Sequence, residues 1–317
     1  MLSAQELATA LNISNVRMKQ ILKDRNLDFL RKRENGKIFV PHSTVGILLK
    51  EKGQEIKPEI LSNFILKGGT GKSVLNVNYS CWLAERSLNP ILLIDLDGEA
   101  CASNMLLKEQ ENLDNLVTIY EILKNNLQIK DYVRETKYPN LFILPARMKA
   151  LKSERLAGGR NPKTLLRKHM KGLAQRFGSI IFDMPPTLNS LTVSALLTIS
   201  KLVIPINSDI FSIESLYLTL DELKEYAEEY ECSIPEYYIL MNKFQSNTIA
   251  SSEAYKEITK NFGDRLIPTQ LKFSAQINNS VNNGKTIREG CARELRASFD
   301  EVASYITGTK NNQELAQ

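Results

Sequence analysis

A short glycine-rich segment, LKGGTGKSV at residues 66–74, constrains the fold of this chain more than any other feature. It follows an apolar run at residues 61–66 and precedes a segment of helical character that begins near Lys72. In a strand, glycine turn and helix of this kind, backbone N–H groups and the helix N-terminus converge on one point and bind phosphate. The segment therefore predicts a phosphate-binding loop, and a merely structural glycine turn is the less favoured interpretation.

Apolar runs alternate with helix-length amphipathic segments through most of the chain. After residues 61–66, strand-like runs occur at residues 91–95, 141–145, 180–183, 202–206, 237–241 and 266–268. This alternation predicts an α/β fold, with a mostly parallel sheet covered by helices on both faces. We assign residues 56–308 to this P-loop NTPase domain and residues 309–317 to a polar tail.

Three aspartates follow predicted strands at one edge of this sheet. Asp95 and Asp97 come from ILLIDLD, and Asp183 ends SIIFD. Because the carboxyl ends of parallel strands share an edge, we expect these acids to converge near the phosphate loop. Lys72 is expected to bind the β- and γ-phosphates and Ser73 to bind Mg²⁺. Asp183 is then predicted to bind Mg²⁺ directly or through water, Asp95 to support the ligands of the metal, and Asp97 to orient the attacking water. For any one of these acids alone, a solvated turn carboxylate is a fair alternative.

Positive charge gathers at the N-terminal end. The chain has a net charge of +5, and residues 1–50 hold nine Lys and Arg against four acids. A basic excess confined to one end is typical of an added module that binds a polyanion. A solvated surface arm would have the same charge, so the charge alone does not decide.

The spacing of apolar residues predicts a fold for this basic end. Two short helices are expected on either side of a turn near Ser14, the second with Val16, Ile21 and Leu22 facing inward. A hairpin around Asn35-Gly36 and a third helix follow. This order resembles a winged helix-turn-helix domain over residues 1–55, used for DNA binding or dimerisation. A small helical cap used only for dimerisation is the alternative. The predicted DNA-binding residues are Asn15, Arg17, Met18 and Lys19 in the second helix and Arg31, Lys32, Arg33 and Lys37 in the hairpin.

The small numbers of histidine and cysteine residues exclude several classes of protein. Only two histidines and four widely spaced cysteines occur, so a serine or cysteine triad, a disulfide framework and a zinc site are not indicated. No window approaches the roughly 20 apolar residues of a membrane span. We expect a cytoplasmic protein with reduced thiols.

A family resemblance rests on three motifs. The lysine-first loop of residues 67–73, the DLD of residues 95–97 and FDMPPT at residues 182–187 resemble the deviant Walker ATPases, and within them the ParA-type partition ATPases, over residues 61–306. The resemblance implies that Lys67 reaches across an ATP-bound homodimer to the partner's phosphates and acts in catalysis with Lys72 and Asp97. It also implies nucleotide contacts from Lys67, Gly68, Gly69, Thr70, Gly71, Lys72, Ser73 and Val74, with Asn242 and Pro268 beside adenine.

The same resemblance implies a function. ATP-bound dimers would bind DNA without sequence preference and associate with the nucleoid, and a ParB-like centromere-binding protein would stimulate slow ATP hydrolysis. The helix-turn-helix would bind an operator and regulate the chain's own operon. For the non-specific DNA surface we predict five basic residues of the C-terminal helical region, for which solvated helix faces are the alternative: Lys272, Lys285, Arg288, Arg293 and Arg296.

Some residues bear on nucleotide choice and on competing functions. In MNKFQ, Gln245 stands where guanine recognition would need an aspartate, so ATP is favoured over GTP. Gly98-Glu99 replaces the Pro-Gln usual in partition ATPases, which keeps open an ATP-sensing transcription regulator with little hydrolysis. The end of the chain, GTKNNQELAQ, lacks the amphipathic pattern of a MinD-like membrane anchor, so no membrane partner is expected.

Overall fold

A seven-stranded sheet forms the centre of the molecule in a computed structural model that describes residues 2–31, 36–107, 116–147, 158–245 and 248–309. The strand order is β10-β9-β4-β8-β5-β7-β6, and every pairing is parallel except that of β6 with β7. The mostly parallel α/β sheet predicted from the sequence is confirmed. The strands are β4 (Ile60–Asn63), β5 (Ile91–Asp95), β6 (Arg134–Glu135), β7 (Leu141–Leu144), β8 (Ser179–Asp183), β9 (Lys201–Ile206) and β10 (Glu236–Met241).

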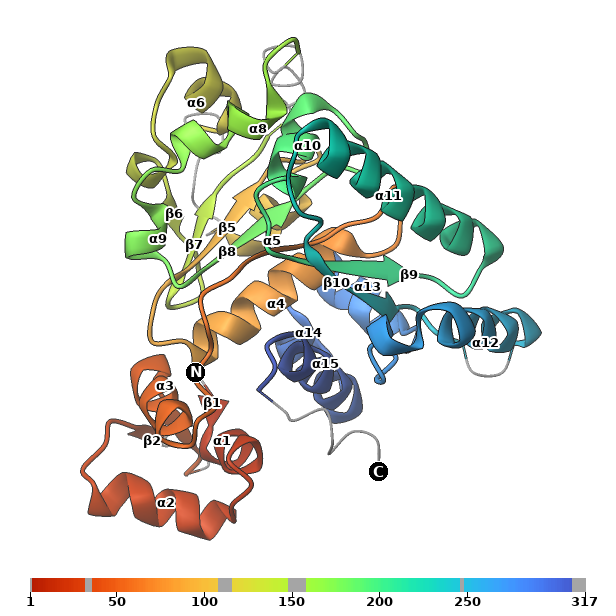
Figure 1. Ribbon diagram of the computed structural model, residues 1–317. Coiled ribbons are helices and arrows are strands. Elements are labelled where there is room, and N and C mark those ends of the chain that lie inside the picture. The colour runs from red at the N-terminus through yellow and green to blue at the C-terminus, as the bar shows by residue number, and fades with distance from the viewer. Residues whose placement is uncertain (1, 32–35, 108–115, 148–157, 246–247, 310–317) are drawn as a thin grey trace.

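Helices cover both faces of this sheet, with a separate apolar cluster under each face (Figure 1). One face carries α6 (Ile119–Asn125), α8 (Pro162–Leu165), α9 (Leu173–Arg176), α10 (Ser190–Leu196), α11 (Ile210–Glu229) and α12 (Ile249–Phe262), with the short 3₁₀ turns η2 (Ile129–Asp131) and η4 (Arg167–His169); η5 (Gly263–Arg265) follows α12. The other face carries α4 (Lys72–Arg86), α5 (Cys101–Leu106), α13 (Ala275–Asn282), α14 (Ile287–Gly290) and α15 (Arg293–Ile306). Strands β5, β8 and β9 are buried along their whole length, as their continuous apolar sequences require.

Two predicted strands differ from those observed. The run at residues 61–66 forms a strand only as far as Asn63, because the chain then turns into the glycine loop. Residues 266–268 make one isolated bridge, Ile239 to Leu266, rather than a strand. The Ile267 N–H donates to the Ile239 carbonyl at 2.9 Å, and the next backbone bond to β10 comes only from Leu271, to the Met241 carbonyl.

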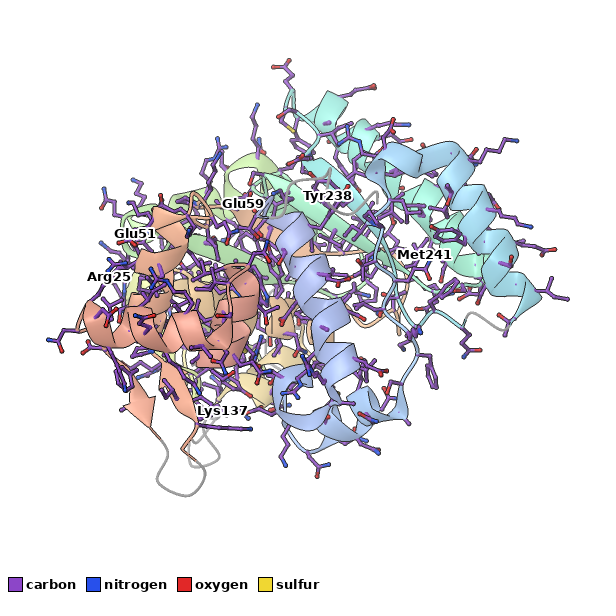
Figure 2. The ribbon with its side chains drawn as sticks, turned by 90° about the horizontal axis from the view of Figure 1, so that it is seen from below. Arg25, Glu51, Glu59, Lys137, Tyr238 and Met241 are labelled. Atoms are coloured by element: carbon purple, nitrogen blue, oxygen red, sulfur yellow. The ribbon has the colours of Figure 1, made fainter. Side chains whose placement is uncertain are left out.

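The N-terminal module, which we define as residues 2–51 excluding 32–35, has a core of its own. Its elements are β1 (Leu2–Ser3), α1 (Ala4–Ala10), α2 (Asn15–Asp24), β2 (Leu30–Arg31), β3 (Ile38–Val40) and α3 (His42–Glu51). The strands form an antiparallel sheet in the order β1-β3-β2. An ion pair of 2.7 Å between Arg25 and Glu51 joins the ends of α2 and α3 on the surface (Figure 2). The module therefore consists of two short helices joined by a turn and a third helix, beside a small sheet.

The inward face of α2 differs from the prediction. Val16 was expected in the core and Met18 at the surface, but Val16 is 78% exposed and Met18 is fully buried with Leu22. The two buried side chains lie one helical turn apart and pack against α1. The prediction that Met18 faces base edges is therefore wrong.

Candidate nucleotide-binding site

The phosphate loop connects β4 to α4 and is held from outside by two side chains of the segment after β10. Asn242 donates from Nδ2 to the Thr70 carbonyl at 2.7 Å, and Lys243 donates from Nζ to the Gly69 carbonyl at 2.6 Å. Gly71 caps α4 with a φ of 89°, and a Cβ at this position would lie 2.8 Å from Asn242 Nδ2. Only glycine suits this backbone conformation and this close approach.

Lys72 is the first residue of α4 and is nearly enclosed, with 7% of its surface exposed. Its Nζ donates to the Lys67 carbonyl at 2.7 Å. Burial lowers the pKa of Lys72, against the opposing influence of Asp183, Asp97 and Glu99. A buried ammonium at a helix N-terminus is positioned to bind phosphate oxygens, which would replace its lost hydration.

Asp95 and Asp183 lie opposite each other in the parallel pairing of β5 with β8, and both are fully buried. Asp183 Oδ1 accepts from Asn76 Nδ2 at 2.8 Å, whereas Oδ2 has no hydrogen-bond partner among the described residues. Burial raises the pKa of Asp183 to about 6, although Asn76 and Ser73 favour its ionised form. The negative charge of this carboxylate is therefore only partly stabilised by groups of the protein itself.

The carboxylate of Asp95 is fully engaged by its own loop. Oδ2 accepts from the backbone N–H and the hydroxyl of Ser103 at 3.0 and 2.7 Å, and Oδ1 accepts from the Asp97 N–H at 3.0 Å. Burial and the neighbouring Asp183 raise the pKa of Asp95 well above its ordinary value, and these hydrogen bonds only partly oppose the shift. Asp95 therefore orients the segment that carries Asp97.

Asp97 is half-buried at the start of the loop after β5. Its Oδ1 accepts from the Glu99 N–H at 2.9 Å, which makes a tight turn through Gly98. The Glu99 side chain is exposed beside it. Asp97 acts electrostatically on both Lys72 and Asp183, and its partial exposure places it at the rim of the site.

Lys67 lies before the glycines and points toward the N-terminus of α11. Its Nζ contacts Asp209 Oδ1 at 2.6 Å and Ser212 Oγ at 2.9 Å. Asp209 also caps α11 by accepting from the Ser212 N–H. Burial raises the pKa of Asp209, but Lys67 and the two bonds from Ser212 outweigh it, so that the net pKa is lowered. The side chain of Lys67 remains 24% exposed, so this ion pair is accessible to exchange.

The donor set fits Mg²⁺ together with a nucleotide. Two oxygen atoms beside the loop could be metal ligands. One is the buried Oδ2 of Asp183, which has no hydrogen-bond partner among the described residues, and the other is the hydroxyl of Ser73, which lowers the pKa of Asp183. Thr70 Oγ1 is also buried without a partner among the described residues. Among the described residues, no group of three or more His, Cys, Asp or Glu side chains could hold a metal ion. Mg²⁺ typically uses one or two carboxylates and takes its remaining ligands from phosphates and water.

Comparison with known proteins decides the family. A family model described as an AAA domain, AAA_31, matches residues 59–235, more than half of the chain. The chain belongs to this family. The family includes P-loop ATPases of the ParA, Soj and MinD type, and membership supports ATPase activity.

Curated relatives of this AAA_31 chain include partition proteins. Cell division protein PomZ of Myxococcus xanthus is 25% identical over 271 residues, which cover 81% of this chain and 82% of PomZ. Chromosome-partitioning ATPase Soj of Treponema pallidum is 25% identical over 242 residues, which cover 76% of this chain and 93% of Soj. The alignments span most of both proteins.

Solved structures support the same fold. An ATP complex of Cyanothece McdA superposes with a TM-score of 0.70 at 19% identity, covering 80% of this chain and 98% of McdA. Cobyrinic acid a,c-diamide synthase from Mycobacterium smegmatis with ADP and magnesium gives 0.64 at 18% identity, covering 78% and 93%. Since McdA and the diamide synthase share this α/β fold, the fold alone does not identify the function.

The predicted nucleotide-binding residues fall into two groups. Lys67 through Val74 form the loop and the first turn of α4. Asn242 donates to the Thr70 carbonyl, so here it supports the phosphate loop, while Pro268 is exposed in the segment beside β10. Their proximity to adenine stays a prediction.

The predicted DNA-binding residues are dispersed. On α2, Arg17 and Lys19 are exposed, whereas Asn15 is partly buried. Lys37 is exposed; Lys32 and Arg33, and the side chain of Arg31, lie outside the described residues. In the C-terminal region Lys272, Lys285 and Arg293 are exposed, and Arg296 is partly buried. No helix in the described ranges is long and apolar enough to cross a membrane.

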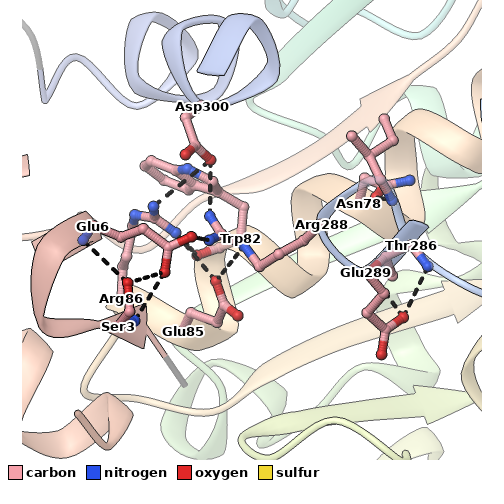
Figure 3. A network of polar contacts seen from close by, with 11 residues as sticks. Ser3, Glu6, Asn78, Trp82, Glu85, Arg86, Thr286, Arg288, Glu289 and Asp300 are labelled. Carbon is pink, nitrogen blue, oxygen red and sulfur yellow. Dashed lines mark hydrogen bonds and ion pairs between the residues drawn. The ribbon is translucent and has the colours of Figure 1, made fainter. Parts of the chain in front are cut away.

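Arg288 corrects the prediction of a C-terminal DNA surface. Its guanidinium contacts Glu6 at 2.8 Å, Glu85 at 3.0 Å and Asp300 at 3.0 Å (Figure 3). These carboxylates come from α1, α4 and α15, and they leave the guanidinium largely buried. Arg288 therefore joins the N-terminal module to the ATPase domain and is not available to DNA phosphates in this arrangement.

Four residues that position the site were not predicted from the sequence. Asn76 holds Asp183, Ser103 holds Asp95, Asp209 holds Lys67, and Lys243 holds the loop. Asn76 could have been predicted, because it lies one helical turn after Lys72 on the same face of a predicted helix. The sequence contains no signal for Asp209, which is 142 residues from Lys67.

Proposed function

We propose that this chain is a DNA partition ATPase that dimerises around ATP. The observation that carries the proposal is the arrangement of two lysines at one phosphate loop. Lys72 already supplies an enclosed ammonium within the loop, whereas Lys67 points away and pairs with Asp209 and Ser212. A second lysine held outside the loop is suited to reach the phosphates of a partner copy.

The proposed ATP cycle assigns a task to each group. When bound, Mg²⁺ would neutralise negative charge on the phosphates. Asp183 and Ser73 would hold it, with Asp95 supporting the shell through the loop it orients. Lys72 would bind the β- and γ-phosphates, and Asp97, at the rim, would orient the attacking water. Hydrolysis is slow until a partner protein rearranges this rim.

The proposed biological role follows from coupling ATP to dimerisation. ATP-bound dimers bind non-specific DNA across the nucleoid in the cytoplasm, using Lys272, Lys285, Arg293 and Arg296. A ParB-like centromere-binding protein stimulates hydrolysis and releases monomers, so that DNA cargo follows the remaining dimers. The N-terminal module, as a winged helix-turn-helix over residues 1–55, binds an operator. The name of the relative Soj, a chromosome-partitioning ATPase, supports this role.

The test is retention of random-sequence DNA by the purified chain with ATP, with ADP and without nucleotide. We expect retention only with ATP and its loss in Lys67→Ala, which should still bind ATP as a monomer. Lys260→Ala, which removes an exposed lysine of α12, is the matched control. DNA retention that is indifferent to nucleotide, or unchanged in Lys67→Ala, would overturn the ATP-dependent dimer.

A second candidate is an ATP-sensing transcription regulator with little hydrolysis. It is favoured by the turn in which Glu99 places a carboxylate beside Asp97. Negative charge at this position opposes the approach of phosphate. Phosphate release measured with DNA and partner, in the wild type and in Glu99→Gln, separates the two functions. A regulator would show negligible turnover in the wild type under every condition.

A further inference from the structure

The outer face of α2 carries side chains that do not hold the N-terminal module together. Met18 and Leu22 form the inner face and are fully buried. On the opposite side Val16 is 78% exposed, together with the exposed Arg17 and Gln20. Figure 1 shows α2 on the side of the module turned away from the ATPase domain, and no described part of the chain covers it.

Val16, Arg17 and Gln20 form one surface, which we call the α2 patch. Arg17 Nη1 donates to Gln20 Oε1 at 3.3 Å, and Val16 precedes Gln20 by four residues, so their side chains are neighbours on the helix. Ser14 accepts from the Arg17 N–H at 3.1 Å and fixes the start of the helix beneath the patch. The patch is therefore an ordered combination of an apolar group, a guanidinium and an amide.

The members of the patch match two kinds of group on base edges, hydrogen-bond acceptors and a methyl group. Because its oxygen is engaged by Arg17, Gln20 presents its amide N–H groups as donors. Arg17 has further N–H groups, and both residues suit the acceptors of purines or thymine O4 in the major groove. Val16 offers only methyl groups, whose counterpart in that groove is the 5-methyl of thymine.

The charge around the patch favours duplex DNA as the occupant over a protein. Lys19 and Lys23 are exposed on the same helix, within the basic excess of residues 1–50. These lysines lie one helical turn apart on the same face of α2, so they can bind successive phosphates along one side of a groove. Phosphate binding alone would not involve an exposed valine, since phosphates offer no apolar surface.

We propose that α2 lies in the major groove of DNA and that Val16 contacts the 5-methyl group of one thymine, which makes Val16 a determinant of sequence specificity. This inference rests on the proposed function, in which the N-terminal module binds an operator. It adds the chemical feature of the site that is read and the residue that reads it.

The experiment begins with selection of sites from a random duplex library by the full-length protein without nucleotide, so that ATP-dependent binding does not contribute. In the selected site each thymine is then replaced singly by uracil, which removes only the methyl group. Affinity for every duplex is measured for the wild type, for Val16→Ala and for the control Ile47→Ala, which truncates an exposed apolar residue of α3. Val16→Ala should fold, because the side chain is exposed and alanine favours helix.

We expect uracil at one position to weaken wild-type and Ile47→Ala binding about fourfold, the loss expected for one methyl group. At that position the same replacement should leave Val16→Ala binding unchanged. A selected site at which every uracil replacement affects Val16→Ala and wild type equally would overturn the valine contact and leave operator binding intact. Failure to select any sequence would overturn both the inference and operator binding, without affecting the ATP-dependent retention test.

Discussion

Helix α4 has a cluster of charged residues at each end, and the two clusters differ in how well neighbouring groups of the protein stabilise the charges. At its first residue, Lys72 lies near Asp183, whose neighbour in the sheet is Asp95, and burial lowers the pKa of the lysine and raises those of both acids. At its last residue, Arg86 lies in the network of Figure 3, where Arg288 contacts three carboxylates.

The pKa shifts at the second cluster mostly run in the opposite direction. Burial raises the pKa of Glu6, but Arg288, Ser3 and Arg86 outweigh it and lower the net value. Burial lowers the pKa of Arg288, and its three carboxylate neighbours more than restore it. The exception is Arg86, which burial holds at a pKa of about 10 while it stacks 4.2 Å above the Trp82 ring.

This difference separates a ligand site from a structural contact. The charges at the phosphate loop are only partly stabilised by the protein itself and would be balanced by a bound phosphate and cation. Such perturbed charges are typical of a functional site. Apart from Arg86, the charges at the domain junction compensate one another within the chain. Four predictions test this distinction, and they are taken from the largest expected effect to the smallest.

Lys72→Ala should weaken ATP binding by about 100-fold or more, because a charge-assisted contact to phosphate is lost in an enclosed position. Isothermal calorimetry with ATP and Mg²⁺ measures the effect, with Lys260→Ala as the control. Tight binding by Lys72→Ala would show that the enclosed ammonium is structural, like the junction charges.

Asp183→Asn should raise the free energy of unfolding of the nucleotide-free chain at pH 7.5 by on the order of 1–3 kcal/mol. The folded pKa of about 6 lies above the ordinary 3.8, so the ionised group reduces stability above pH 6. This penalty disappears as the pH falls from about 6 toward 3.8, because the folded state binds the proton first. Urea denaturation at pH 7.5 and pH 4 should show the gain only at the higher pH. A loss of stability at pH 7.5 would mean that Asp183 is well compensated.

Asp209→Asn should strengthen ATP-dependent dimerisation a few-fold, because it releases Lys67 from a partly exposed ion pair of about 0.2–1 kcal/mol. Asparagine caps helices as well as aspartate does, so α11 should begin normally. Sedimentation velocity with ATP measures the dimer constant, and Lys67→Ala provides the opposite result. Weaker dimerisation in Asp209→Asn would indicate that the contact between Lys67 and Asp209 persists in the dimer.

Glu6→Gln should have the smallest effect, a loss of about 1 kcal/mol or less in the free energy of unfolding, since Glu6 is partly exposed. Glutamine preserves the capping box with Ser3 and removes only the charge that contacts Arg288. Because the folded pKa is depressed, this contribution is present above pH 4.5 and is lost as the pH falls through the folded value. Urea denaturation at pH 7 and pH 4 measures it, and unchanged ATP affinity would confirm that the two ends of α4 have separate roles.

Much of the ATPase domain was predictable, because its signals are local. Strands β5, β8, β9 and β10 are continuous apolar runs, and the glycine loop requires a backbone that few other residues adopt. The carboxylates followed from their places at strand ends. The outer face of α2 was not predictable, because in a short helix with few apolar residues either Val16 or Met18 can turn inward, and packing against α1 decides.

By itself, the sequence determined the order of most strands and helices of the ATPase domain, the phosphate loop and the presence of a basic N-terminal module, since each depends on residues close together in the chain. Only the tertiary structure decided which charges are compensated. Lys67 meets Asp209 across 142 residues, and Arg288 meets Glu6 across 282. Whether a buried charge is left for a ligand or satisfied within the protein depends on such distant partners, and no local pattern specifies them.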